Sequence, residues 1–328
     1  MMNKKASPIR PKTAKKPLEG YRVPFSRLLR VVLGAGSGEG EKIPVGGQAV
    51  IEGVLMKGPT RWGLAVRRPD GVIFRESWVS SSRTKHYPWK LPLLRGFMTM
   101  AEMMVVGFRA LGRSAEVALE ESGEEMTKKD LFIAVIVGIA AVVGLFIALP
   151  LWLSDVATRA FTLSDAAHNG VEGVFRGLMF VGYVALIGLW GDIQEVFRYH
   201  GAEHKTINAF EKNLELTPKM VAAQSRVHPR CGTSFLLIAI LIGIVVFSVA
   251  GKGGILWRVG SRVALLPLVI GVSYEFIRLA AWSGLAGKIL IFPMLCLQYL
   301  TTREPGLRQI EVALASLEEA MKKDESEV

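Results

Sequence analysis

The sequence is poor in cysteine, which excludes a fold held together by disulfide bonds. Cys231 and Cys296 are the two cysteines among 328 residues, too few for the disulfide framework of a small secreted domain. Cys296 lies in an apolar run and is interpreted as a packed side chain. Cys231 lies in a polar segment near histidines, so it is the cysteine to which we assign chemistry.

Two common sequence signatures are also absent. No long apolar segment with a small-residue cleavage site follows the basic N-terminus, so a secretory signal peptide is not expected. The glycines of residues 45–56 are not followed by Gly-Lys-Ser/Thr, and the Gly-x-Gly-x-x-Gly pattern is missing. Nucleotide binding at these glycines is therefore not expected.

Acidic residues are fewer than basic ones, and the difference is concentrated at the N-terminus. The chain carries 40 Lys and Arg against 29 Asp and Glu, and nine of the basic residues but a single acid lie in residues 1–30. A tail of this kind, residues 1–41, cannot bury a core and is expected to be disordered. Its expected partner is the anionic lipid surface, at about 1 kcal/mol per nearby Lys or Arg. No specific nucleic acid is expected, because stacking aromatics and a recognised nucleic-acid-binding fold are missing.

Long apolar runs follow residue 130. Half of all residues are apolar and the mean hydropathy is +0.33, which is typical of a membrane protein. Four runs are predicted to be transmembrane helices: residues 131–153, 174–193, 235–250 and 263–277. Residues 285–300 could form a fifth span, a re-entrant segment or an interfacial helix. The predicted fold class is a polytopic α-helical membrane protein, with about four transmembrane helices in residues 130–300.

Residues 42–90 precede these runs and predict a small β-rich cytoplasmic domain. Residues 62–66 and 72–79 alternate apolar and polar side chains, and Pro69-Asp70-Gly71 between them is typical of a hairpin turn. With the glycine-punctuated stretch 45–56, they favour a sheet of about three or four strands.

Two amphipathic helices flank the apolar region in the sequence. Residues 91–129 predict a Met-rich amphipathic helix followed by a linker. Residues 301–328 predict another, whose apolar residues alternate spacings of three and four: Leu307, Ile310, Leu314, Leu317 and Met321. This narrow apolar seam could join two copies of the chain into a homo-oligomer, or it could dock on the chain's own β domain.

Basic residues in the connections predict the orientation in the membrane. The connection 194–234 carries six Lys and Arg, whereas 154–173 carries only Arg159. By the positive-inside rule, the connection 194–234 and both termini are expected in the cytoplasm. The connection 251–262 carries Lys252, Arg258 and Arg262 and argues mildly against this orientation.

The connection 194–234 gathers the residues best suited to hold a metal. It contains three of the five histidines. His200 and His204 share one face if the second span continues as a helix beyond the membrane surface. His228 and Cys231 follow in His-Pro-Arg-Cys, and imidazole and thiolate are the usual ligands of zinc. These four residues are therefore predicted to bind Zn²⁺ or another divalent transition metal.

Glu203 lies between two of the predicted ligands and is predicted to be a general base. His-x-x-Glu-His is also the inverted zinc-protease pattern, which is short and occurs here in a different setting. A polar network without a metal is the alternative interpretation of these residues. His86 and His168 are isolated in the sequence and are interpreted as surface residues.

Further acidic residues could orient the ligands or contact the site: Glu52, Asp192, Glu195 and Glu275. Glu52 is the single acid in an apolar stretch, where a strand residue facing solvent is the simpler interpretation. Asp192 and Glu195 lie on the general side of the helix that carries His200. Glu275 ends an apolar run, and acids inside a membrane are usually functional, although a pair with Arg278 would also explain it.

Four stretches resemble the YqhQ-like family of bacterial membrane proteins: residues 45–56 (VGGQAVIEGVLM), 199–208 (YHGAEHKTIN), 228–234 (HPRCGTS) and 300–305 (LTTREP). The resemblance extends over nearly the whole chain. This family has no known function and is described in general terms as a predicted metal-dependent enzyme. The resemblance therefore implies a metal at the matching positions: His200, Glu203, His204, His228 and Cys231.

The expected function is that of a membrane-embedded, metal-dependent enzyme in the bacterial cytoplasmic (inner) membrane. Within this class we expect a hydrolase with a cytoplasm-facing site, in which metal-bound water attacks the substrate and Glu203 acts as the base. A scaffold or regulator with a structural zinc site is one alternative. A cation transporter with acids along its path is another, although no internal repeat is evident.

Overall fold

The computed structural model describes residues 45–119, 128–161, 165–229, 231–249, 253–282 and 284–322. The basic tail of residues 1–41, with its expected contact to anionic lipid, lies outside these ranges. So does the acidic part of the expected linker after residue 119. The strands are β1 (Gly46–Val50), β2 (Gly53–Lys57), β3 (Arg61–Arg67) and β4 (Ile73–Val79). The helices are α2 (Leu94–Leu119), α3 (Lys128–Val143), α4 (Leu149–Phe161), α5 (Asp165–Ile187), α6 (Gly191–Glu211), α7 (Pro218–Ala222), α8 (Gly232–Val249), α9 (Ile255–Trp282), α10 (Gly284–Thr301) and α11 (Leu307–Ala320).

The strands among the described residues form one antiparallel sheet in the order β1-β2-β3-β4. Neighbouring strands are joined by short turns, as in successive hairpins. In the β3–β4 turn, Gly71 has a φ of 88°, and the Asp70 carboxylate accepts a hydrogen bond from the N–H of Val72 at 2.8 Å. The sheet expected in residues 42–90 and its Pro-Asp-Gly turn are confirmed.

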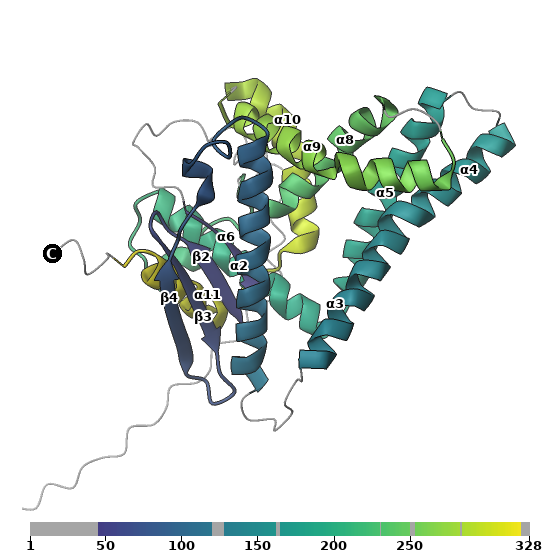
Figure 1. Cartoon of the computed structure of the whole chain (residues 1–328). Coiled ribbons are helices and arrows are strands. Elements are labelled where there is room, and N and C mark those ends of the chain that lie inside the picture. Colours follow the sequence, from purple (N-terminus) through teal and green to yellow (C-terminus); the bar gives the residue numbers. More distant parts are fainter. Residues whose placement is uncertain are drawn as a thin grey trace, which may run out of the picture. The chain divides into compact units, whose positions relative to one another are not determined.

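Helices cover both faces of this sheet (Figure 1). Val54 and Met56 of β2 pack in one cluster with Ile310 of α11. Leu55, which lies between them, points to the opposite face and packs in a second cluster with Ala110 of α2. Because successive side chains of a strand alternate between faces, a sheet covered on both sides reads as a continuous apolar run rather than as alternation.

The C-terminal helix docks on the chain's own sheet, one of the two roles left open by its sequence. The Ser316 hydroxyl donates a hydrogen bond to the carbonyl oxygen of Gly63 at 2.9 Å. A Cβ atom on Gly63 would lie 2.3 Å from the carbonyl oxygen of Ser316, so glycine permits this close approach. The expected apolar seam is thereby used inside one chain.

Three helical segments of the described residues are long and apolar enough to cross a membrane: Ile136–Phe161, Gly170–Ile187 and Leu256–Ala280. They coincide with three of the four predicted spans. The fourth predicted span, residues 235–250, forms α8, whose apolar part Phe235–Phe247 is shorter. The structure is therefore mostly helical, with three candidate membrane spans and a small N-terminal sheet.

The second span does not continue into the helix that carries the histidines, contrary to the expectation. The chain leaves the helical conformation after α5, and Trp190 has an extended backbone with a ψ of 137° before α6 begins. Gly188 lies in this turn, and its carbonyl oxygen accepts a hydrogen bond from Arg303 Nη2 at 2.8 Å. The turn is stabilised by this long-range contact, which local periodicity does not reveal.

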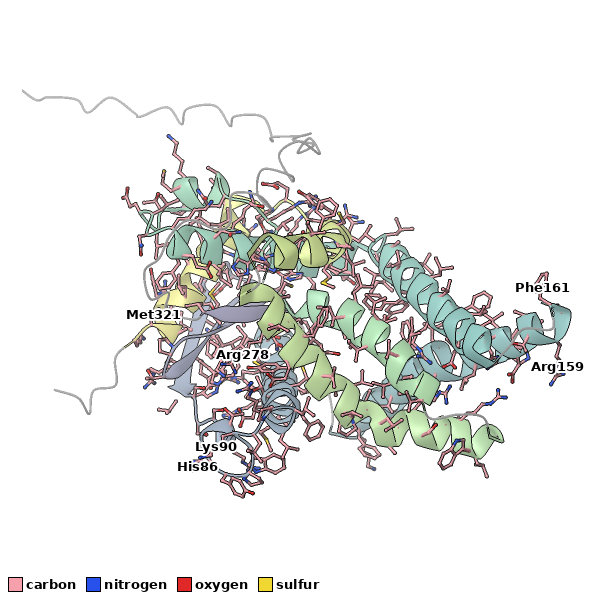
Figure 2. The ribbon with its side chains drawn as sticks, turned by 90° about the horizontal axis from the view of Figure 1, so that it is seen from above. His86, Lys90, Arg159, Phe161, Arg278 and Met321 are labelled. Atoms are coloured by element: carbon pink, nitrogen blue, oxygen red, sulfur yellow. The ribbon has the colours of Figure 1, made fainter. Side chains whose placement is uncertain are left out.

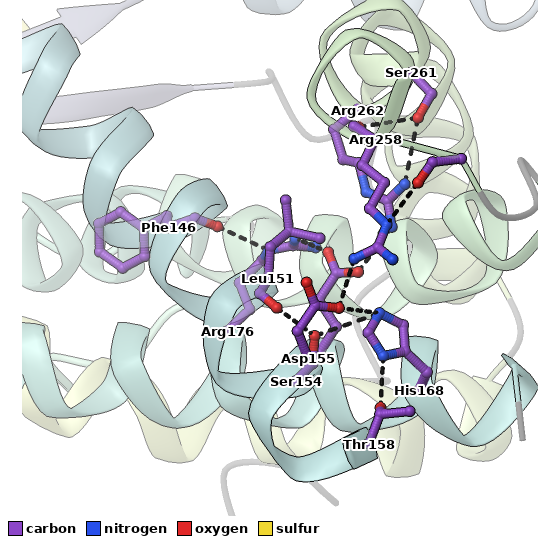
Figure 3. Close-up of polar contacts among 12 residues, drawn as sticks. Phe146, Leu151, Ser154, Asp155, Thr158, His168, Arg176, Arg258, Ser261 and Arg262 are labelled. Atoms are coloured by element: carbon purple, nitrogen blue, oxygen red, sulfur yellow. Dashed lines mark hydrogen bonds and ion pairs between the residues drawn. The ribbon is translucent and has the colours of Figure 1, made fainter. Parts of the chain in front are cut away.

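Charged residues form ion pairs between α4, α5 and α9 (Figure 3). Glu172 of α5 is 2% exposed. It accepts hydrogen bonds from Arg176 on the same helix and from Arg262 of α9, the latter at 2.7 Å. Asp155 of α4 accepts a hydrogen bond from Arg258 of α9 at 2.5 Å. Because an unpaired charge in apolar surroundings is costly, these pairs tie α4 and α5 to α9.

This network corrects two sequence interpretations. Arg258 and Arg262 lie within α9 and are paired with acids, so they are not free basic residues of a connection. His168 is buried rather than exposed, and its Nδ1 lies 2.7 Å from the Thr158 hydroxyl oxygen. His86 is exposed, as expected, in the segment between β4 and α2 (Figure 2).

Candidate metal centre

His200 and His204 lie on one face of α6, and a backbone carbonyl holds each ring. The Nδ1 atom of His200 lies 2.8 Å from the carbonyl oxygen of Thr301, and that of His204 lies 2.7 Å from the carbonyl oxygen of Arg226. Since a carbonyl oxygen can only accept, both Nδ1 atoms carry a proton and both Nε2 atoms present a lone pair in the neutral rings. Metal-binding histidines are oriented in the same way.

Cys231 directly precedes α8 and completes a group of three potential ligands. Its Sγ atom lies 3.2 Å from Nε2 of His200, and the ligand atoms of His200, His204 and Cys231 all lie within 4.8 Å of one another. The buried Nε2 of His204 makes no hydrogen bond of regular geometry to the residues that the structure describes. A metal ion would satisfy this atom, so the residues present fit a divalent transition metal of the zinc type.

An amide side chain of α6 holds the loop that orients His204. Asn208 donates hydrogen bonds from Nδ2 to the carbonyl oxygens of Ser225, at 2.8 Å, and Val227, at 3.1 Å. These two residues flank Arg226, whose carbonyl oxygen receives the His204 proton. Asn208 therefore positions a ligand without itself offering a ligand atom.

Close packing between α6 and the segment after α10 fixes the carbonyl that orients His200. A Cβ atom on Gly201 would lie 2.1 Å from the carbonyl oxygen of Arg303. The N–H of Arg303 donates a hydrogen bond to the carbonyl oxygen of Phe197 at 2.8 Å. Glycine at position 201 lets the two backbones approach, which brings Thr301 within reach of the imidazole.

Glu203 is buried beside the same group. Its Oε2 atom has no hydrogen-bond partner among the described residues. A Cβ atom on Gly47 of β1 would lie 3.1 Å from its Oε1 atom, so Gly47 leaves room for the carboxyl. Burial raises the pKa of Glu203 to about 8; His200 lowers this pKa and Cys231 raises it. The carboxyl is therefore mostly protonated at pH 7 in the metal-free protein.

His228 lies next to the three-residue group but directs one nitrogen to an acid. Its ring centroid is 6.0 Å from that of His204, and its Nε2 lies 3.2 Å from Oε1 of Glu211. The Gln298 amide accepts a hydrogen bond from the His228 N–H at 2.9 Å and donates one to its carbonyl oxygen at 2.7 Å. The structure thus brings three of the four predicted ligands together and places His228 beside them.

Two of the predicted supporting acids lie near α6. Glu52, at the β1–β2 turn with a φ of 48°, accepts a hydrogen bond from the Tyr199 hydroxyl at 3.1 Å. Since Tyr199 precedes His200, Glu52 reaches the site through one neighbouring residue. Glu195 accepts hydrogen bonds from Arg198, at 2.7 Å, and from Gln309 of α11.

The other two supporting acids have different surroundings. Asp192 is exposed in the first turn of α6, where the helix dipole favours an acid. Glu275 accepts two hydrogen bonds from Arg95 of α2, at 2.6 and 2.5 Å. The observed partner of Glu275 therefore belongs to α2 and not to the candidate metal centre.

Asn208, Gln298 and Gly201 were not singled out from the sequence. Asn208 carried a signal, because it lies four residues after His204 and so shares its helix face. Gln298 is an amide inside an apolar run, which also indicates a buried polar role. Gly201 carried no such signal, because its role depends on a segment that is remote in the sequence.

Comparisons with known proteins place the chain in a family without an assigned function. Residues 91–323 match the family described as "Protein of unknown function (DUF1385)". The chain is 35% identical over 303 residues to "Uncharacterized protein YqhQ" of Bacillus subtilis (strain 168), an alignment that covers 86% of this chain and 94% of that protein. No solved structure matches the chain. The chain belongs to the DUF1385 family of proteins of unknown function.

Proposed function

We propose that this protein is a membrane-embedded, metal-dependent hydrolase. The observation that supports it is the group formed by His200, His204 and Cys231, whose ligand atoms lie within 4.8 Å of one another. Three protein ligands leave a coordination position open, as in catalytic zinc sites, whereas structural sites are usually closed by four. A zinc ion or another divalent transition metal held there would supply a Lewis acid that polarises the substrate and acidifies water.

The position of His228 favours the catalytic over the structural alternative. A structural site would use His228 as a fourth ligand, but its Nε2 is directed to Glu211. His228 is buried and would lie beside the substrate rather than close the site. The two alternatives therefore predict different effects of removing the His228 imidazole: zinc binding is kept at a catalytic site and lost at a structural one.

Glu203 is the proposed general base, which takes up the proton that water loses as it attacks the substrate. It is buried and retains an oxygen atom without a partner among the described residues. Its raised pKa would disfavour this role in the metal-free protein. A nearby divalent cation stabilises the carboxylate, so the residue becomes a base when the site is loaded.

We place the protein in the bacterial inner membrane, with the sheet, α6 and α11 on the cytoplasmic side. The bacterial relative and the apolar helices support this location. Arg258 and Arg262 are paired with acids of neighbouring helices, so they no longer count against this orientation. The basic residues of connection 194–234 then favour the cytoplasmic side for that connection. A site that adjoins apolar helices is suited to a substrate that is itself embedded in the membrane.

A thiol nucleophile is the second candidate chemistry. The 3.2 Å distance between Cys231 Sγ and His200 Nε2 also suits a cysteine activated by a neighbouring imidazole. In this alternative Thr301 would orient the imidazole through its carbonyl, and no metal would be needed. Zinc binding and thiol reactivity compete for the same sulfur atom, so one experiment separates them.

The test is the metal content of the full chain, purified in mild detergent and offered zinc. We expect about one zinc ion per wild-type chain, loss of that ion in His204→Ala and Cys231→Ala, and retention in His228→Gln. Zinc should also protect Cys231 from a thiol-alkylating reagent in a Cys296→Ser background. Loss of zinc in His228→Gln, with the fold intact by circular dichroism, would support the structural alternative. A folded wild type that binds no zinc and has a rapidly alkylated Cys231 would support the thiol alternative.

A further inference from the structure

An apolar cavity of about 250 Å³ lies between α8, α9 and α10. Its walls include Ile238, Leu241 and Ile242 of α8, Phe276 of α9, and Pro293 and Met294 of α10. All the lining residues are apolar. A cavity of this chemistry favours hydrocarbon over water.

The same helices that line the cavity also hold the candidate metal centre. Cys231 immediately precedes α8, and Ile238 lies about two helical turns, or roughly 10 Å, further along that helix. Met294 lies about one turn before Gln298, whose amide holds the backbone of His228. Thr301, at the end of α10, receives the His200 proton. The cavity and the metal centre therefore lie along the same two helices, α8 and α10.

The cavity opens to the outside of the protein between α8 and α10, where two of its lining residues are exposed. Leu241 is 51% exposed and Ile289, which also lines the cavity, is 66% exposed. Leu241 lies in an uncharged stretch of α8, and Ile289 follows Lys288, the one charged residue of the otherwise uncharged α10. Exposed apolar residues of this kind suit a surface that faces lipid. A chain from the bilayer can enter the cavity from this side without crossing water.

We propose that this cavity holds the hydrocarbon chain of a bilayer amphiphile while the polar head of the same molecule lies at His200, His204 and Cys231. The identification of this amphiphile as the substrate rests on the proposed hydrolase function. The chain would be held by van der Waals packing against the apolar lining, because moving it from the bilayer into the cavity removes little apolar surface from water. It would also position the head group, because one end of the molecule is held about two helical turns from the ligands.

The test uses the full chain in vesicles of phosphatidylcholine and phosphatidylglycerol. A small fraction of the phosphatidylglycerol carries a photoactivatable diazirine on one acyl chain, and cross-linked peptides are identified by mass spectrometry. We expect labelling to concentrate, several-fold and saturably, on the cavity-lining parts of α8 and α10. The comparison surface is α3, where Phe132 is 66% exposed and Ile133 is 58% exposed.

Two matched substitutions on α8 compare a larger side chain inside the cavity with the same change outside it. Leu241→Trp places a larger side chain at the cavity wall, whereas Leu236→Trp makes the same change on α8 at a residue outside the lining. The two leucines are 51% and 46% exposed. We expect Leu241→Trp to reduce labelling of α10 several-fold and Leu236→Trp to leave it unchanged, with zinc content equal in both.

The outcomes separate this inference from the proposed function. Saturable cavity labelling that is lost in Leu241→Trp and kept in the zinc-free His204→Ala supports the cavity as the chain site. Equal, unsaturable labelling of every lipid-facing helix would overturn it. The proposed function would not be affected, because the zinc measurement tests it separately. Cavity labelling in a wild type that binds no zinc would overturn the assignment of the lipid as a substrate for metal-dependent hydrolysis.

Discussion

At the scale of single residues, the geometry of the candidate metal centre is set by groups that offer no ligand atom. The carbonyl oxygens of Thr301 and Arg226 select the tautomer of each histidine. Asn208 holds the loop around Arg226, and Gly201 lets the segment after α10 approach α6. Such orienting contacts typically change metal affinity by about 10- to 100-fold when they are lost.

Gly201→Ala tests this dependence. The added Cβ would lie 2.1 Å from the Arg303 carbonyl oxygen, so the segment must move and carry the Thr301 carbonyl away from His200. We expect the free energy of unfolding to fall by about 1–3 kcal/mol, as for other overpacked sites, and zinc affinity to fall as well. Both can be measured in detergent, by chemical denaturation and by competition with a chelator.

Gly191→Ala is the matched control, because nothing lies within 4 Å of a Cβ atom at that position of the same helix. It should leave zinc affinity unchanged and stability unchanged or raised by up to about 1 kcal/mol. Equal losses in the two variants would show that the close approach at Gly201 does not position the ligands.

At the scale of elements, polar contacts decide which helices are neighbours inside the apolar region. A helix that is apolar on all sides has no preferred face, so its hydrophobicity alone does not choose a partner. Glu172 supplies the preference, because it pairs with Arg176 on α5 and Arg262 on α9. In the sheet domain the apolar face of an amphipathic helix determines the packing instead, because α11 covers β2 and β3 with that face.

Glu172→Gln is expected to destabilise the protein strongly. Both arginine side chains would keep their positive charge in a buried position without an anion, a change that typically costs about 3–5 kcal/mol. Glu318→Gln is the control, since Glu318 pairs with Arg75 where the two side chains are 62% and 44% exposed. That surface pair should contribute at most about 1 kcal/mol. Equal and small losses, measured by denaturation in mixed micelles, would contradict the structural role of Glu172.

At the scale of the whole molecule, the proposed orientation in a bilayer depends on the charged and apolar parts of the chain. The apolar segment Ile136–Phe161 follows the sheet in the chain, and Arg159 lies in its last turn. An impermeant thiol reagent should therefore reach Asp70→Cys and Arg159→Cys from opposite sides of the membrane. Both residues are exposed, and the chain's own cysteines are replaced by serine for this measurement.

With the orientation proposed here, Asp70→Cys reacts from the cytoplasmic side, because basic connections are retained there. Labelling of intact cells and of inverted vesicles gives the two sides separately. Reaction of both positions from one side would show that Ile136–Phe161 does not cross the membrane. Reaction from opposite sides in the reverse sense would overturn the orientation alone.

The sequence by itself determined the features that depend on neighbouring residues. Pro69-Asp70-Gly71 predicted the hairpin turn because Gly71 adopts a positive φ at no steric cost. The apolar runs predicted the three candidate spans, because length and composition decide whether a helix can cross a bilayer. The spacing of His200 and His204 predicted one helix face, since residues four apart are neighbours on any α-helix.

Only the tertiary structure decided which remote groups meet. His200 lies within hydrogen-bond distance of the Thr301 carbonyl oxygen, 101 residues away in the sequence. Glu275 pairs with Arg95, 180 residues away, and the His228 imidazole contacts Glu211. The spacing of residues in the sequence cannot rank these partners, because each contact depends on how complete helices pack. The end of the second span at Ile187, before α6 begins, and the burial of His168 were likewise seen only in the structure. The sequence therefore brought the four candidate ligands into one segment, whereas the separation of His228 from the group of His200, His204 and Cys231 followed only from the fold.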